Sequence, residues 1–277
     1  METTDVDVAR MAAAAGATVV RSMYGDDLTH LDKSPTDFAT EADLASERAI
    51  RDVIAAARPD DTFEGEETGA TLGVSDRRWL VDPLCGTLNF AAGTPLAAVN
   101  VALQTPSGVT AAASADPIAD ELFWTDGHGA WVRRAESDHT LVPSARSLIV
   151  DVNCDGKRDT EFLGGQLIAD AAFREVFAPR VLSSTLAVAW VAAGRRAAYV
   201  TDGWLSGSVH FTAGIALCQA AGCVVTDLAG GPVHEGRGLI AAADEETHER
   251  LVALVAPHLA RVGGAGRGRP GRGRPGR

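Results

Sequence analysis

The stretch of sequence that decides the fold is Trp79-Leu80-Val81-Asp82-Pro83-Leu84-Cys85-Gly86-Thr87-Leu88-Asn89-Phe90. Its first four residues predict a short strand that ends in a carboxylate, and Asp-Pro followed by Gly-Thr predicts a turn. Such a turn directs carboxylate, hydroxyl and main-chain carbonyl oxygens into one small space, which suits hard divalent cations such as Mg²⁺. An Asp-capped turn without an ion is the simpler alternative for this segment taken alone.

Two further acidic clusters precede this stretch, Thr40-Glu41-Ala42-Asp43 and Gly65-Glu66-Glu67. The first lies at the start of a predicted helix over residues 40–57, because acids follow Thr40 in the first turn. Apolar residues at helical spacing predict another amphipathic helix over residues 4–23. Taken together, the three acidic clusters favour a metal site over a capped turn.

The order of the remaining elements divides the chain into two lobes and a tail. Strand-length runs at 97–104, 108–115, 121–125 and 129–133 predict a largely antiparallel sheet in an α+β lobe, residues 1–146. Strands alternate with helices in residues 147–262, which predicts an α/β lobe. Residues 263–277 contain five arginines, no acid and only Gly, Ala and Pro besides, so this tail is expected to be disordered.

Composition limits the partners that the chain is expected to have. The 277 residues carry a formal net charge of −12, which argues against nucleic acid as the main partner. The basic tail could contact RNA or an acidic surface, although a solvated extension is the simpler interpretation. No apolar run is long enough to cross a membrane, and the acidic N-terminus does not resemble a signal peptide, so we expect a cytoplasmic location.

The four cysteines form no CxxC pair, so the sequence indicates neither a zinc ribbon nor a redox motif. Cys218 and Cys223 have apolar neighbours, and Cys154 lies in a polar turn. In a cytosolic chain all four are expected to be free thiols.

The ordered motifs resemble those of the inositol monophosphatase-like, Mg²⁺-dependent and lithium-sensitive phosphatases over about residues 5–255. The resemblance rests on Thr40-Glu41-Ala42-Asp43 with Glu47, on Gly65-Glu66-Glu67, on the stretch quoted above, on Asp116-Pro117 with Glu121-Leu122-Phe123, and on Ala213-Gly214 through Asp227. It implies a layered αβαβα sandwich, a homodimer and a small phosphate-bearing substrate.

The same resemblance implies a set of functional residues. It assigns a first Mg²⁺ to Glu66, Asp82, the Leu84 carbonyl and the region of Thr87. It assigns a looser ion to the neighbourhood of Glu66 and Asp43. Glu66 and Thr87 are then expected to orient the attacking hydroxide, and the main chain at Gly86 and Thr87 to hold the phosphate. Ser184 and Asp202 occupy positions at which relatives bind the substrate alcohol.

The sequence departs from the family pattern at the second Mg²⁺. Relatives hold this ion with the carboxylate equivalent to Asp82 and with two further aspartates, which are replaced here by Cys85 and His210. A glutamate that usually follows the late Ala-Gly is Ala220. Thiolate and imidazole are poor Mg²⁺ ligands, so the sequence argues against ordinary Mg²⁺ phosphatase activity.

Three interpretations of Cys85 and His210 stay open at this point. Together with Asp82 they could hold a softer ion such as Zn²⁺, or Mn²⁺, in a phosphatase with a changed metal. They could form a thiolate–imidazolium pair that supports covalent or acid–base chemistry in a re-used pocket. They could also be lost ligands in a protein that binds a ligand or partner without catalysis.

We predict that Cys85→Asp combined with His210→Asp raises Mg²⁺-dependent phosphate release by orders of magnitude, because it restores the missing carboxylates. Calorimetry of Mg²⁺ binding and the rate of phosphate release test this. A double variant that gains neither affinity nor rate would contradict it.

Overall fold

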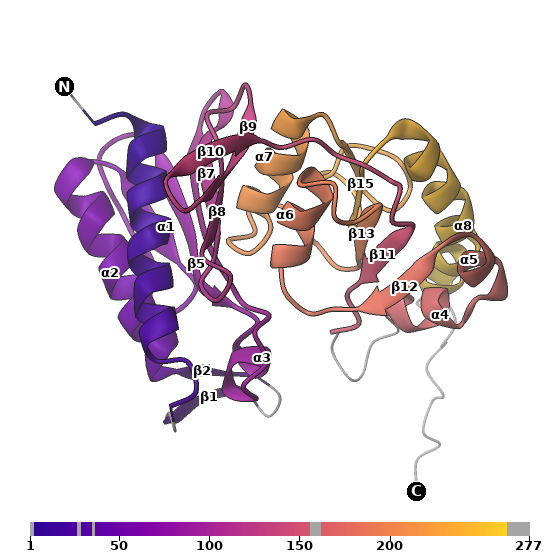
Figure 1. The fold of residues 1–277 in the computed structure, drawn as a ribbon, viewed down its shortest axis with the longest axis horizontal. Helices are drawn as coiled ribbons and strands as arrows, with labels where there is room; N and C mark the ends of the chain where they lie inside the picture. The colour runs from indigo at the N-terminus through magenta and orange to yellow at the C-terminus, as the bar shows by residue number, and fades with distance from the viewer. Residues whose placement is uncertain (1–2, 27–28, 35–36, 156–161, 265–277) are drawn as a thin grey trace, which may run out of the picture.

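The computed structural model describes residues 3–26, 29–34, 37–155 and 162–264. They form five layers in the order helix, sheet, helix, sheet, helix, which confirms the αβαβα sandwich (Figure 1). Both predicted helices of the first lobe are present, as α1 (Asp5–Ser22) and α2 (Glu41–Ala57). Each begins at a threonine, Thr4 or Thr40, in a capping box that satisfies the first main-chain amides.

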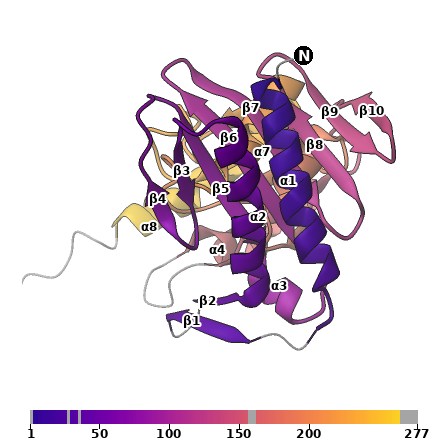
Figure 2. The same ribbon diagram turned by 90° about the vertical axis from the view of Figure 1, so that its left-hand side faces the viewer.

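The outer layer consists of α1 and α2, which lie side by side on one face of the first sheet (Figure 2). Their buried faces join Trp79 and Val81 in one apolar cluster. The two helices approach closely at Gly16, where a Cβ atom would lie 2.7 Å from Ile50 Cδ1 and 2.8 Å from Ser46 Oγ. Glycine at this position therefore sets the separation of the two helices.

The first sheet has the strand order β10-β9-β8-β7-β6-β5-β3-β4, and all pairs are antiparallel except β3 with β5. Its strands are β3 (Thr62–Gly65), β4 (Gly69–Thr71), β5 (Arg78–Cys85), β6 (Ala98–Thr105), β7 (Gly108–Asp116), β8 (Glu121–Thr125), β9 (Ala130–Arg134) and β10 (Ser137–Thr140). The parallel pairing places the ends of β3 and β5 together, and these are the ends that carry Glu66 and Asp82.

The second lobe supplies the other three layers. Helices α6 (Leu186–Ala192) and α7 (Thr212–Ala221) lie between the two sheets, and α7 packs on β6 and β7 (Figure 1). The second sheet has the order β12-β11-β13-β15-β14. Its strands are β11 (Ile149–Val152), β12 (Ala178–Val181), β13 (Ala198–Thr201), β14 (Val224–Thr226) and β15 (Leu239–Ala242), and the outer helices are α4 (Leu163–Ala169), α5 (Ala171–Val176) and α8 (Glu245–Gly264).

Several short elements were not predicted. A hairpin of β1 (His30–Ser34) and β2 (Asp37–Thr40) lies between the two predicted helices. The helices α3 (Thr87–Ala91), α4 and α5 and the strand β10 were also missed, because such short elements depend on tertiary contacts more than on local pattern. Helix α8 extends to Gly264, and residues 265–277 of the predicted tail lie outside the described residues. Among the described residues, no helix has the length and apolar character that a membrane crossing requires.

We predict that Gly16→Ala lowers the free energy of unfolding by about 1–3 kcal/mol, because the new methyl group overpacks the contact with Ile50 and Ser46. Denaturant unfolding measures the change. Gly165→Ala in α4 is the matched control, since nothing lies within 4 Å of its Cβ position, and it should stabilise by about 0.5–1 kcal/mol. Equal changes in the free energy of unfolding in the two variants would contradict the proposed overpacking at Gly16.

Candidate active site

The site is centred on Asp82, which is 0% exposed in strand β5. Asp82 and Cys85 are three positions apart, so a regular strand would direct their side chains to opposite faces. The pairing with β6 is irregular here, because Asp82 faces Asn100 while Cys85 faces Ala98. This bulge directs both side chains to one side, and Pro83 is tolerated within it.

The hydroxyl of Thr87, the first residue of α3, links two of the predicted metal-site residues. It donates to Asp43 Oδ1, at 3.0 Å, and lies 3.1 Å from the Leu84 carbonyl oxygen. Asp43 is itself buried, and its Oδ2 accepts hydrogen bonds from the main chain and hydroxyl of Thr40. The cap of α2 therefore positions a carboxylate that in turn positions the Thr87 hydroxyl.

Glu66 follows β3 and reaches the same region. Its side chain is 20% exposed, and Oε2 lies 3.8 Å from Nδ1 of His210. Its main-chain amide donates to the Val81 carbonyl at 3.1 Å, which ties the residue to β5 just before Asp82.

Glu47 holds the turn that follows Glu66, a role that the sequence analysis did not assign. The carboxylate is 1% exposed and accepts the amides of Glu67, at 2.8 Å, and Thr68, at 3.0 Å. A Cβ atom on Gly65 would lie 2.4 Å from Glu47 Oε2. Asp43 and Glu47 are four residues apart, so their carboxylates lie one turn apart on the same face of α2. Gly65, which has no side chain, leaves room for the Glu47 carboxylate.

Cys85 contacts the second lobe. Its Sγ accepts a hydrogen bond from the main-chain amide of Thr185 at 3.3 Å, and its carbonyl accepts one from the hydroxyl of Ser184 at 3.3 Å. Burial, together with the nearby Asp82 carboxylate, raises the pKa of the Cys85 thiol well above its usual value. The thiol is therefore neutral at pH 7 unless a cation offsets these effects.

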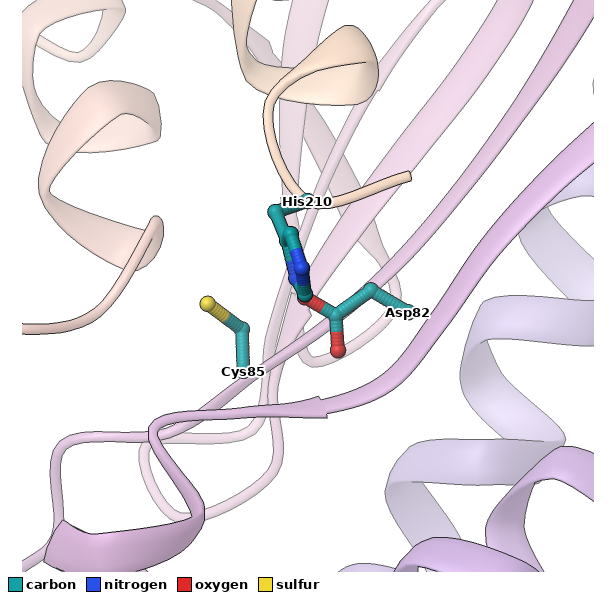
Figure 3. A group of neighbouring side chains, drawn as sticks. All are labelled: Asp82, Cys85 and His210. Atoms are coloured by element: carbon teal, nitrogen blue, oxygen red, sulfur yellow. The ribbon is translucent and has the colours of Figure 1, made fainter. Parts of the chain in front are cut away.

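His210 comes from the loop that precedes α7, and its side chain is 42% exposed. Its Nδ1 lies 2.8 Å from Asp82 Oδ2. Figure 3 shows the His210 ring from the second lobe against the Asp82 carboxylate from the first lobe, with the Cys85 side chain beside them. One ligand-type atom from each lies within 4.8 Å of the others. The structure thus brings together Cys85 and His210, the two positions at which the resemblance predicts altered metal ligands.

The predicted substrate-binding residues have different surroundings. Gly86 has φ 100°, and a Cβ atom there would lie 2.7 Å from the Leu96 carbonyl, so glycine is needed at this turn. Ser184 is 3% exposed, and its oxygen also accepts from the Leu186 amide.

Asp202 is 6% exposed, and its carboxylate binds the Arg237 guanidinium and the amides of Leu163 and Gly203. Arg237 was not singled out from the sequence, because 35 residues separate it from its partner. Both carboxylate oxygens of Asp202 thus serve the internal structure of the second lobe.

Comparisons with known proteins agree with the fold. The profile of the inositol monophosphatase family matches residues 2–260. A relative named inositol-1-monophosphatase, from Mesorhizobium japonicum, is 33% identical over 237 residues, which cover 82% of this chain and 86% of the relative. A relative named Nus factor SuhB, from Pasteurella multocida, is 32% identical over 265 residues, which cover 92% and 97%.

Solved structures of the same family have the same fold. The extragenic suppressor protein suhB from Bartonella henselae has a TM-score of 0.79 and 30% identity, with 90% of this chain and 97% of that chain covered. The Thermotoga maritima IMPase has a TM-score of 0.78 and 23% identity over 91% of this chain and 96% of that chain, and it supports the fold alone. The layers and the acidic motifs together define a class of metal-dependent phosphatases. Within that class, the chain belongs to the inositol monophosphatase family.

We predict that Glu47→Gln lowers the free energy of unfolding by about 1.5–3 kcal/mol, because two amides lose a charged acceptor in a buried place. Chemical denaturation measures the loss. Glu249→Gln, an exposed position in α8, is the matched control and should change stability by less than about 0.5 kcal/mol. A loss no larger than that of the control would show that Glu47 does not hold the turn.

Proposed function

We propose that this protein hydrolyses a small phosphomonoester with the help of divalent cations, and that its second cation position has an altered ligand set. Family members are generally Mg²⁺-dependent and act on small phosphate-bearing substrates. The observation that carries the proposal is the connected arrangement of Asp43, Thr87 and the Leu84 carbonyl next to the buried Asp82.

The residues of the first cation position fit Mg²⁺. Glu66 and Asp82 offer carboxylate oxygens and Leu84 a carbonyl oxygen, and hard oxygen donors are the ligands that Mg²⁺ prefers. Asp82 is 0% exposed, and burial of a carboxylate is costly without a positive partner. When bound there, Mg²⁺ would supply positive charge that activates water and offsets the charge of the phosphoryl group.

The chain's own residues then have distinct roles in the hydrolysis. The Glu66 carboxylate accepts a proton from the attacking water, and the Thr87 hydroxyl, held by Asp43, orients that water. Main-chain N–H groups at Gly86 and Thr87 hold the phosphate. Water adds its oxygen to phosphorus as the ester P–O bond breaks, so the products are an alcohol and inorganic phosphate.

Two other functions remain alternatives. An enzyme that uses a Cys85–His210 pair needs a thiolate nucleophile, which burial and the Asp82 carboxylate disfavour. A non-catalytic role is supported by the relatives named Nus factor SuhB, which match 91–92% of this chain at 30–32% identity. The partner would then be a component of a transcription complex.

Phosphate release tests the proposed function. Metal-stripped protein receives Mg²⁺, Mn²⁺ or Zn²⁺ with a panel of sugar, inositol and nucleotide monophosphates. We expect metal-dependent turnover, and we expect Thr87→Ala to lower kcat/KM by about 100- to 1000-fold, because the orienting hydroxyl is lost.

The matched control is Thr18→Ala on the exposed face of α1, which should retain the wild-type rate. Folded protein that releases no phosphate with any of the three cations would contradict the proposal and favour the binding role. Equal rates for Thr87→Ala and the wild type would contradict the assignment of Thr87.

A further inference from the structure

We infer that Asp82, Cys85 and His210 form a binding site selective for Zn²⁺ over Mg²⁺. The inference names the cation at the second position of the proposed phosphatase. The binding of Zn²⁺ does not depend on the proposed function, and only a part for Zn²⁺ in catalysis rests on it. The three residues offer one oxygen, one sulfur and one nitrogen, all within 4.8 Å of one another (Figure 3). Asp82 and Cys85 come from the end of β5, and His210 comes from the other lobe.

The donor atoms decide which ion the site takes. Mg²⁺ requires an octahedron of oxygen ligands, and thiolate and imidazole do not fit it. Zn²⁺ binds carboxylate, thiolate and imidazole together, and catalytic zinc sites have three protein ligands with a fourth position open. Asp82, Cys85 and His210 supply that number of ligands.

The separations are close to those that zinc needs. Bonds of about 2.0–2.3 Å in a tetrahedron place neighbouring ligand atoms about 3.3–3.7 Å apart. Asp82 Oδ2 and His210 Nδ1 are 2.8 Å apart, and an ion between them would replace their hydrogen bond. The widest separation between ligand atoms is at most 4.8 Å, and a shift of about 1 Å in the side chains would bring it into the tetrahedral range. Cys85 and His210 are partly exposed, so their side chains have room to move.

Surrounding groups already hold two of the ligands. The Thr185 amide donates to Cys85 Sγ at 3.3 Å, and the Thr185 hydroxyl accepts a hydrogen bond from the fully buried Asn100 side chain at 2.8 Å. The Leu84 amide donates to Asp82 Oδ1 at 3.2 Å, which leaves Oδ2 directed at His210. Hydrogen bonds of this kind orient the ligands of metal sites.

A competing explanation needs no ion. A protonated His210 imidazolium, 2.8 Å from Asp82 and 3.8 Å from Glu66, would itself supply the positive charge that these carboxylates need. That explanation gives Cys85 no part. The behaviour of the Cys85 sulfur therefore separates the two explanations.

The test is a titration of metal-stripped protein with Co²⁺, a spectroscopic substitute for zinc. Binding releases the thiol proton of Cys85 to the buffer as the Co–S bond forms. We expect an ultraviolet thiolate-to-cobalt charge-transfer band, which stoichiometric Zn²⁺ removes and a large excess of Mg²⁺ does not. Cys85→Ser should abolish the band, whereas Cys154→Ser, at a partly exposed cysteine, should keep it.

A second variant covers the case in which Cys85→Ser does not fold. His210→Ala should lower the affinity for Zn²⁺ by roughly 100-fold, measured by competition with a chelating dye. A wild-type protein without the band, or a band that survives Cys85→Ser, would overturn the inference in favour of the imidazolium. No substrate enters this titration, so its failure and the absence of phosphate release are separate results.

Discussion

The buried carboxylate of Asp82 is the constraint on which the rest of the structure depends. An ionised group that is 0% exposed costs roughly several kcal/mol unless a positive or hydrogen-bonding partner compensates it. Its partners come from both lobes, the Leu84 amide from its own strand and His210 from the loop before α7. The five layers bring these segments together, because α7 packs on the sheet that contains β5.

The sequence predicted much of this architecture and part of the site. Ordered motifs led to the layered sandwich, and helical periods located α1 and α2 within a residue or two. The approach of His210 to Asp82 followed from the resemblance and not from spacing, since 128 residues separate them. Glu47 lay within a recognised motif, but its function depends on amides some twenty residues away, which no local pattern encodes.

The site separates into a framework and a set of donor atoms. The framework is the capping box of α2, the Thr87 hydroxyl and the Glu47 carboxylate, which are joined by hydrogen bonds to the segments around the site. The donor atoms are those of Asp82, Cys85 and His210, and the resemblance predicts that the last two replace aspartates of the family. Such a division explains how one fold can keep its geometry while the chemistry of one cation position changes.

The Asp202–Arg237 pair has a consequence for how this protein can diversify. The pair holds the start of the segment 203–209, and α7 begins at Thr212, just after its end, so the segment is held on both sides. Loop closure becomes only slightly less favourable with each added residue. Within the segment, Leu205 is 5% exposed and packs in the apolar core, whereas Trp204 is 76% exposed, so changes of length are tolerated best at Trp204. A change of length at this exposed point therefore leaves both ends of the segment, and with them His210, under little strain.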